Sequence, residues 1–360
     1  MRDLIQKRVV KLKERLSQEA LEGMLITNLT NVRYLSGFTG SAGTCLIFDK
    51  KSYFISDGRY LTQAREQVQG MEVIIDSGTH LQIIKRNKLI SNGAVLGFEA
   101  DYLTVSQMNQ LQELFPQTQW ESTSRIVEEI AAIKDESELR ALRVAIEITD
   151  KVFDQLTPEL RPGSIEREVA AKISFAYKIL GADGDSYHPI VASGPNSALP
   201  HAVPSDRVFQ NGDFVVLDFG ALYQGYHADM TRTIAIGTVT DRHREVYAVV
   251  QEAQQRGCQA ARAGMTCREL DTVTRNYISE QGYGDYYVHG TGHGLGLEVH
   301  TMPRVSQVSE DTLQENYVVT IEPGIYIPDW GGVRIEDDIL ICKDGAEVLN
   351  QSPRDLMVLN

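Results

Sequence analysis

Residues 288–300 read VHGTGHGLGLEVH, and this run holds three of the eight histidines in the 360-residue chain. His289 and His293 lie four positions apart, which would place them on one face of a helix. The alternating glycines exclude a helix, because each would cost about 1 kcal/mol relative to alanine in a helix interior. In a strand the same spacing also puts both side chains on one face, and glycine lets other groups approach the backbone. The run therefore predicts a strand that lines a site.

The flanking sequence predicts an α+β domain. A helix capped by Asp135 is expected to run to about Leu156, followed by helices at 164–180, 241–262 and 268–281. Apolar runs typical of buried strands are DFVVLDFG at 213–220, TRTIAIG at 231–237, YVVTIEPGIYI at 317–327 and GGVRIEDDILIC at 331–342. Because strands and helices each come in pairs, we expect an antiparallel sheet backed by helices.

The first third of the chain has a different pattern. Short apolar strands, from GMLITN at 23–28 to AVLGFE at 94–99, alternate with helices expected near 59–69 and 104–115. A length of 360 residues also exceeds that of a usual single core. We therefore expect an α/β amino-terminal domain over residues 1–130 and an α+β domain over residues 131–360.

Composition narrows the class of protein. A net charge of -14 and a pI near 5.1 argue against binding to nucleic acid or to an anionic membrane. No run approaches the roughly 20 apolar residues of a membrane span, and the amphipathic amino terminus lacks the core of a signal peptide. The four cysteines form no C-x-x-C pair, which suits a reducing compartment. These features predict a cytoplasmic enzyme.

Four acidic residues lie in or beside the predicted core strands: Asp218, Asp229, Glu322 and Glu336. A buried carboxylate without a partner costs far more free energy than a fold can tolerate. Any one of the four alone could be a salt-bridged or edge-strand residue. All four together, beside a histidine framed by glycines, need a shared cause.

A pair of divalent cations supplies that cause. Two such ions would balance four carboxylates, and one neutral imidazole would complete the ligand set. Oxygen-rich sites with a single nitrogen ligand and no thiolate favour Mn²⁺, Co²⁺ or Zn²⁺. Two ions about 3.5–4 Å apart can activate a water molecule and polarise a carbonyl group. We expect a hydrolase with two divalent metal ions, Mn²⁺ first, with Co²⁺ and Zn²⁺ as alternatives.

Five motifs carry a family resemblance. In chain order they are LDFG with Asp218, ADMTRT with Asp229, HGTGHGLG with His293, IEPGIY with Glu322 and RIEDD with Glu336. From about residue 133 to the end, the chain closely resembles the metallopeptidases aminopeptidase P, prolidase and methionine aminopeptidase, which share the pita-bread fold. The resemblance implies that Asp229 and Glu336 bridge two metals, that Asp218 holds one, and that His293 and Glu322 hold the other. It also implies that Glu322 handles the proton of a bridging hydroxide.

The amino-terminal region suggests the branch of this family. Residues 1–130 resemble the amino-terminal domain of the Xaa-Pro peptidases and creatinase, a domain that methionine aminopeptidases generally lack. YLSGFTGSAG at 34–43 and SDGRY at 56–60 look more like aminopeptidase P than prolidase. We therefore expect an Xaa-Pro aminopeptidase, which would release the first residue of peptides with proline in second position. The alternatives are an Xaa-Pro dipeptidase and a non-catalytic binding protein of the same fold.

Three further histidines fit cleavage before proline. An Xaa-Pro bond has no N–H and a tertiary leaving nitrogen, so donors must reach the carbonyl oxygen and the nitrogen instead. His201, His289 and His300 match the non-ligand histidines of the proline-specific members. By resemblance we expect them to stabilise the tetrahedral oxygen, with His201 and His300 also contacting the substrate.

Other residues have expected supporting roles. The spacing puts Tyr326 on the strand face of Glu322 and Arg334 on that of Glu336, and by resemblance both flank the proline pocket. Thr231 is expected to orient Asp229, and Asp338 to be a hydrogen-bonding neighbour rather than a sixth ligand. Ordinary packing or surface roles are expected for His80, His188, His227 and His243. The resemblance further implies a homodimer.

Overall fold

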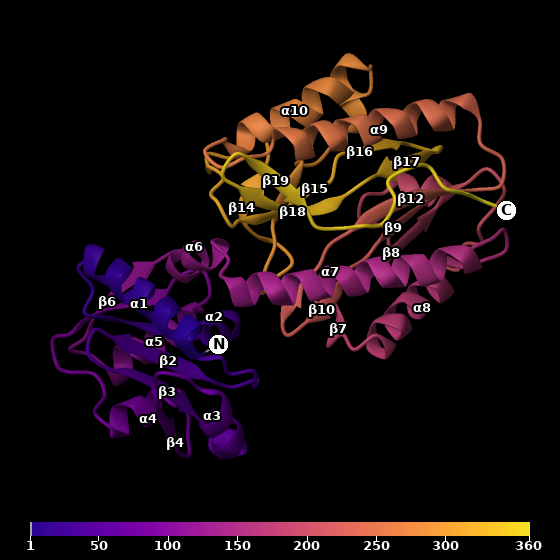
Figure 1. Ribbon diagram of the computed structural model, residues 1–360. Coiled ribbons are helices and arrows are strands. Elements are labelled where there is room, and N and C mark those ends of the chain that lie inside the picture. Colours follow the sequence, from indigo (N-terminus) through magenta and orange to yellow (C-terminus); the bar gives the residue numbers. More distant parts are fainter. Residues whose placement is uncertain (1) are drawn as a thin grey trace. The chain divides into compact units, whose positions relative to one another are not determined.

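The computed structural model describes residues 2–360. The chain forms two compact units, with the boundary between Ala131 and Ala132, and each unit is described by itself (Figure 1). No helix among the described residues is long and apolar enough to cross a membrane.

The first unit is an α/β domain built on one mixed sheet with the strand order β4-β3-β2-β1-β5-β6. Its strands are β1 (Gly23–Ile26), β2 (Thr44–Phe48), β3 (Ser52–Ser56), β4 (Glu72–Ile75), β5 (Val95–Glu99) and β6 (Gln119–Thr123). Its helices are α1 (Arg2–Gln18), α2 (Leu29–Ser36), α3 (Leu61–Gln67), α4 (His80–Arg86), α5 (Val105–Leu114) and α6 (Ile126–Ala132). Apolar side chains of the strands, including Leu25, Leu46 and Ile55, pack against α4 and α5 in one core cluster. The α/β class expected for this region is confirmed.

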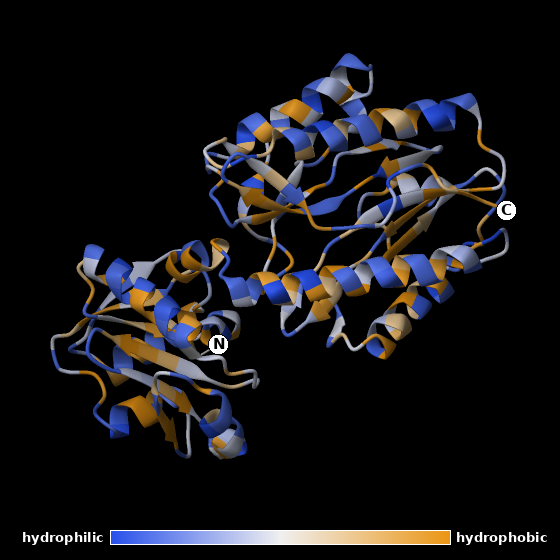
Figure 2. Ribbon diagram, in the orientation of Figure 1, coloured by the Kyte–Doolittle hydropathy of each residue, from blue (hydrophilic) through white to orange (hydrophobic). Residues whose placement is uncertain are grey.

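The second unit has two pairs of helices, one on each side of its strands (Figure 1). The helices are α7 (Glu136–Leu156), α8 (Glu166–Ile179), α9 (Asp241–Ala260) and α10 (Cys267–Glu280). The predicted cap of α7 is present, since Asp135 and Glu138 form a reciprocal capping box. Polar and apolar residues alternate along α7, as expected of a helix with one buried face (Figure 2).

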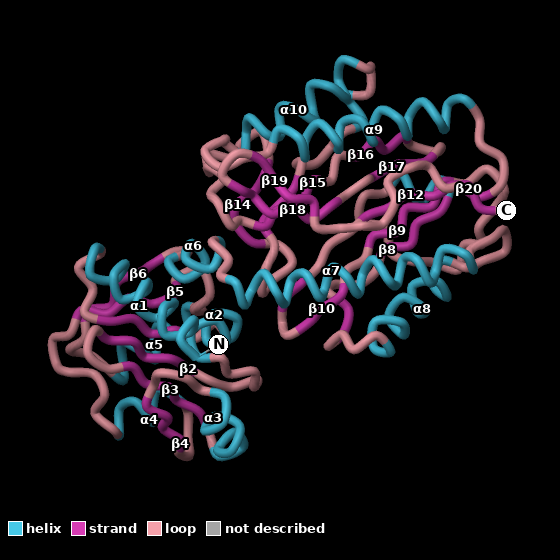
Figure 3. Tube along the Cα trace, viewed as in Figure 1, coloured by secondary structure: helices cyan, strands magenta, loops and turns pink. Residues whose placement is uncertain are grey.

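The strands of the second unit lie between these helix pairs (Figure 3). One sheet has β20 (Val358–Leu359), β12 (Thr231–Ile236), β9 (Phe214–Asp218) and β8 (Ile190–Ser193). Another has β14 (Thr301–Val305), β13 (Gly292–Gly294), β15 (Val318–Ile321), β18 (Asp337–Cys342) and β19 (Gly345–Val348). A hairpin of β16 (Gly324–Ile327) and β17 (Gly331–Arg334), and short strands β7 (Gly184–Asp185), β10 (Ala221–Tyr223) and β11 (Tyr226–His227), complete the domain. The expected α+β architecture is confirmed.

The run 288–300 is less regular than predicted. Only Gly292–Gly294 is strand, and the pairing with β14 shifts between His293 and Gly294. The glycines have the expected reason: a Cβ on Gly292 would lie 1.9 Å from the carbonyl oxygen of Thr320, and one on Gly294 would lie 2.1 Å from that of Met302. A continuous strand over the run is therefore wrong, because the shift in pairing interrupts it.

The predicted strands around Glu322 and Glu336 are each split in two. Glu322 lies between β15 and β16, where Pro323 has no N–H to donate, and Glu336 lies between β17 and β18. Neither Tyr326 and Glu322 nor Arg334 and Glu336 therefore lie on one continuous strand, although Arg334 and Glu336 both line the pocket described below. The two breaks instead leave both carboxylates in the irregular backbone between paired strands.

Candidate metal centre

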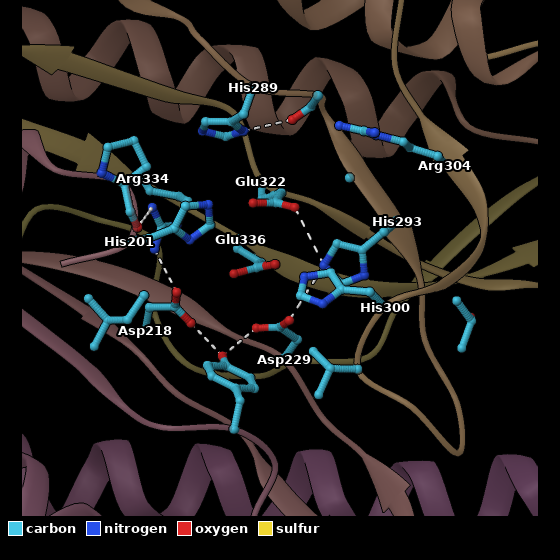
Figure 4. Close-up of a pocket in the computed structure, with 17 residues that line it drawn as sticks. His201, Asp218, Asp229, His289, His293, His300, Arg304, Glu322, Arg334 and Glu336 are labelled. Atoms are coloured by element: carbon cyan, nitrogen blue, oxygen red, sulfur yellow. Dashed lines mark hydrogen bonds and ion pairs between the residues drawn. The ribbon is translucent and has the colours of Figure 1, made fainter. Parts of the chain in front are cut away.

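One pocket of the second unit gathers the five predicted ligands (Figure 4). They come from the ends of strands: Asp218 ends β9, Asp229 precedes β12, His293 lies in β13, Glu322 follows β15 and Glu336 precedes β18. Asp229, His293 and Glu336 offer ligand atoms that all lie within 4.8 Å of one another. His293 Nε2 is also 3.6 Å from Glu322 Oε1. The pocket thus concentrates four carboxylates around one imidazole.

The protein itself leaves most of this negative charge uncompensated. Burial raises the pKa of Asp229, Glu322 and Glu336 well above the usual range of a carboxyl group, and neighbouring carboxylates raise it further. Burial also lowers the pKa of His293 to about 4, so its ring is neutral near pH 7. His293 Nδ1 lies 3.0 Å from the carbonyl oxygen of Gly294, which leaves Nε2 facing the carboxylates. A neutral imidazole in this tautomer is suited to bind a cation.

Arg334 links the pocket to the strands beneath it. Its Nη2 lies 2.6 Å from Asp218 Oδ2, its Nε donates to Thr231 Oγ1 at 3.0 Å, and its Nη1 donates to the Tyr326 hydroxyl at 2.7 Å. Thr231 in turn donates to Glu336 Oε2 at 2.6 Å. The expectation that Thr231 orients Asp229 is therefore wrong, because the backbone N–H of Glu336 pairs with the carbonyl of Thr231 and brings that carboxylate to the hydroxyl.

Asp229 is held from its backbone instead. Its N–H donates to Asp338 Oδ2 at 3.0 Å, as expected for a hydrogen-bonding neighbour. Asp338 does not line the pocket. The structure thus places Asp338 behind Asp229.

The three non-ligand histidines also line the pocket. His289 Nε2 lies 2.8 Å from the Tyr326 hydroxyl, and its Nδ1 lies 2.8 Å from the carbonyl oxygen of Gly290. The His300 ring packs on the His293 ring with centroids 4.2 Å apart. His201 reaches the pocket from the loop that follows β8. Tyr326 itself is not part of the pocket lining, and it acts on the site through its hydroxyl bonds to His289 and Arg334.

Comparisons with known proteins agree with this geometry. Residues 140–343 match the model of metallopeptidase family M24, and residues 8–133 match the Creatinase/Prolidase N-terminal domain. The chain belongs to metallopeptidase family M24. It is therefore a hydrolase of the pita-bread fold, and its family uses divalent metal ions.

Several relatives of this M24 protein match it nearly end to end. The solved Xaa-Pro dipeptidase from Bacillus anthracis is 43% identical, with a TM-score of 0.95 over 99% of this chain and 100% of that one. The Xaa-Pro dipeptidase of Pyrococcus furiosus is 38% identical over 98% of this chain and 100% of its own length. The X-Pro aminopeptidase from Thermotoga maritima is 36% identical, with a TM-score of 0.89 over 94% of this chain and 98% of that one.

These relatives support the dipeptidase alternative better than the aminopeptidase. The expectation of an aminopeptidase depended on the motifs at 34–43 and 56–60. The dipeptidase matches cover 98–99% of the M24 chain, including the amino-terminal domain that holds these motifs.

Tyr187 and Arg304 are among the pocket residues of the M24 domain that were not predicted. The hydroxyl of Tyr187 bonds to both Asp218 Oδ1 and Asp229 Oδ1. Arg304, on β14, is exposed, lines the pocket and makes no ion pair with a carboxylate among residues 2–360. A basic residue four positions after His300 was a usable signal for Arg304, whereas nothing in the sequence around Tyr187 marks it.

The remaining aromatic and histidine residues have structural roles. Trp330 packs edge-on against Phe214, with ring centroids 5.7 Å apart, and does not line the pocket. His80 bonds to the Thr44 hydroxyl, His227 to Ser186, and His243 to the cap residue of α9. The packing roles expected of these three histidines are confirmed, and His188 is exposed.

Proposed function

We propose that this protein is an Xaa-Pro dipeptidase that uses two divalent cations. Mn²⁺ is the first candidate, with Co²⁺ and Zn²⁺ as alternatives. The proposed ligands are the five charged or imidazole side chains gathered in the pocket: Asp218, Asp229, His293, Glu322 and Glu336. The observation that carries the dipeptidase assignment is the unpaired Arg304 beside them.

The donor set fits divalent cations. Four carboxylates line the pocket with only two arginines, Arg304 and Arg334, and no thiol. Oxygen donors with one imidazole suit Mn²⁺, Co²⁺ and Zn²⁺. Bound there, the cations would supply Lewis acidity to the scissile carbonyl and a water activated for attack.

The protein side chains would handle protons and orientation. Glu322 is proposed to accept the proton of the attacking water and to pass it toward the leaving nitrogen. His201 and His300 face the pocket and would donate to the carbonyl oxygen and contact the substrate. Both ring nitrogens of His289 already have partners in Tyr326 and Gly290. We therefore propose that His289 shapes the proline pocket, together with Tyr326 and Arg334.

Arg304 would select substrates of two residues. The product side of an Xaa-Pro dipeptide ends in a carboxylate directly on the proline, whereas a longer peptide has a neutral amide there. A guanidinium group forms a strong, charge-assisted pair with a carboxylate. Its hydrogen bond to a neutral amide carbonyl is weaker. An unpaired arginine at the pocket thus favours the free end of a dipeptide.

The experiment compares hydrolysis of Ala-Pro and Ala-Pro-Ala by the wild-type enzyme and by Arg304→Met. We expect the wild type to prefer Ala-Pro, and the variant to raise KM for Ala-Pro by about 10-fold, equivalent to about 1.4 kcal/mol, with the tripeptide little affected. Arg268→Met, on the exposed face of α10, is the matched control. Equal or faster cleavage of Ala-Pro-Ala by the wild type would favour the aminopeptidase. A metal-loaded protein that cleaves neither peptide would indicate a binding protein.

The family resemblance supports a homodimer, which sedimentation of the purified protein would test. A cytoplasmic location is proposed because no disulfide joins the cysteines, all four of which are free thiols in the described chain.

A further inference from the structure

Tyr187 has an unusual position relative to the proposed ligands. It lies between β7 and β8, and its single hydroxyl bonds to one oxygen of Asp218 and to one oxygen of Asp229. A phenol carries one proton and can donate it fully to only one acceptor at a time. The hydroxyl therefore stands between two carboxylates that would otherwise repel each other.

Asp218 is the most fully engaged of the proposed ligands. Its Oδ2 lies 2.6 Å from Arg334 Nη2, while its Oδ1 accepts from Tyr187. A cation that binds through Asp218 must therefore share or replace one of these two donors. By contrast, Glu322 Oε1 has only a 3.4 Å contact from the Thr320 hydroxyl and lies 3.6 Å from His293 Nε2. The carboxylate oxygens of Asp218 are thus held by strong protein donors, whereas Glu322 Oε1 is not.

We propose that Tyr187 is a positioning residue that competes with the cation shared by Asp218 and Asp229. Its hydroxyl is hydrogen-bonded to an oxygen of each of these two aspartates. We expect this bond to weaken the binding of that cation relative to the cation held through His293 and Glu322. The proposal rests on the ligand set of the proposed function and is independent of which peptide is cleaved. It predicts that removing the hydroxyl tightens one cation position and leaves the other unchanged.

The test removes the hydroxyl and measures cation affinity directly. Chelator-stripped wild type, Tyr187→Phe and Tyr177→Phe are titrated with Mn²⁺ by calorimetry and with Co²⁺ by visible absorption. Tyr177 is a matched control, since it is a buried tyrosine of the same domain whose hydroxyl bonds to neither aspartate among the described residues. Hydrogen bonds to charged groups are strong enough for the dissociation constant of the weaker cation to fall about 10-fold in Tyr187→Phe.

A second measurement separates competition from general damage. Metal-free Tyr187→Phe is expected to melt at a lower temperature than Tyr177→Phe, because its aspartates have lost a donor, and Mn²⁺ should restore most of the difference. Tyr187→Met gives the same comparison if the phenylalanine variant does not fold.

The outcomes distinguish this proposal from the proposed function. Unchanged or weakened binding of the second cation in Tyr187→Phe would overturn the competition. A wild type that binds fewer than two cations would instead refute the ligand set itself.

Discussion

Glu336 and Asp337 are adjacent acidic residues that are both buried, but the protein compensates the charge of only one of them. Their exposed fractions are 2% and 0%. Asp337 is surrounded by donors: Arg232 Nη2 lies 2.7 Å away, and Arg354 Nε and Gln254 Nε2 each lie 2.5 Å away. Glu336 accepts one hydroxyl bond from Thr231 and makes no ion pair within residues 2–360. Burial and the nearby Asp229 raise the pKa of Glu336 well above the usual range.

The comparison shows that burial alone does not identify a metal ligand. The protein neutralises Asp337 with its own arginines, and Arg232 also donates to the backbone carbonyls of Glu336 and Ser352. That cluster fastens the carboxyl-terminal segment to the sheet. Glu336 lacks such compensation, and a buried charge of this kind needs a counter-charge from outside the chain. The distinction predicts opposite results for neutralising the two residues.

Glu336→Gln should have the largest effect, and it should act on activity. Losing a proposed bridging ligand should lower kcat/KM for Ala-Pro by roughly 1,000-fold, equivalent to about 4 kcal/mol. The melting temperature of the metal-free protein should stay the same or rise, because an uncompensated buried charge is removed. Kinetics, metal analysis and thermal melting measure these quantities. A variant with more than a tenth of wild-type activity and full metal content would break the distinction.

Asp337→Asn should act on stability instead. Removing the carboxylate leaves the buried Arg232 and the partly exposed Arg354 without the carboxylate that they share, at a cost of about 3–5 kcal/mol. We expect the melting temperature to fall by on the order of 10 °C. The protein that remains folded should keep its cations. The control is the neighbouring variant Glu336→Gln, which should affect activity instead. Loss of metal at temperatures where Asp337→Asn is still folded would show that the two residues do not act separately.

The proposed metal ligands could be recognised from the sequence, whereas the hydrogen-bond partners that hold them could not. Asp218, Asp229, Glu322 and Glu336 could be recognised because acidic residues in apolar strands are costly, a property that each run displays locally. The partner of Thr231 could not be recognised in the same way. Periodicity gives the face of a strand on which a side chain lies, whereas the strand that packs opposite is set by long-range pairing.

The same limit explains the other misses. Tyr187 reaches Asp218 and Asp229 only because segments distant in sequence meet in the pocket. The breaks at Glu322 and Glu336 interrupt runs whose apolar pattern continues on both sides, so the pattern alone predicts single strands. The fold class depended on local patterns and was accessible, but the hydrogen bonds that orient the site were not.

The smallest expected effect concerns Asp271, which is a buried carboxylate that the protein compensates, as it does Asp337. It lies on α10 and pairs with Arg275 Nε at 2.7 Å, and it accepts from both the N–H and the hydroxyl of Thr291 at 3.0 Å. The carbonyl of Thr291 accepts the N–H of Glu322 at 2.8 Å. Through Thr291 this compensated carboxylate therefore supports a proposed ligand.

Thr291→Val removes the hydroxyl and keeps the shape of the side chain. Since Asp271 retains Arg275 and the backbone N–H, the loss of stability should be about 1–2 kcal/mol, well below that of Asp337→Asn. A displaced Glu322 should lower kcat by a few-fold with little change in KM. Thr291→Ser retains the hydroxyl and should restore kcat, which a role in packing alone would not produce. If the valine and serine variants lower kcat equally, the hydrogen bond from the Thr291 hydroxyl to Asp271 does not position Glu322. In that case Asp271 does not support the metal centre.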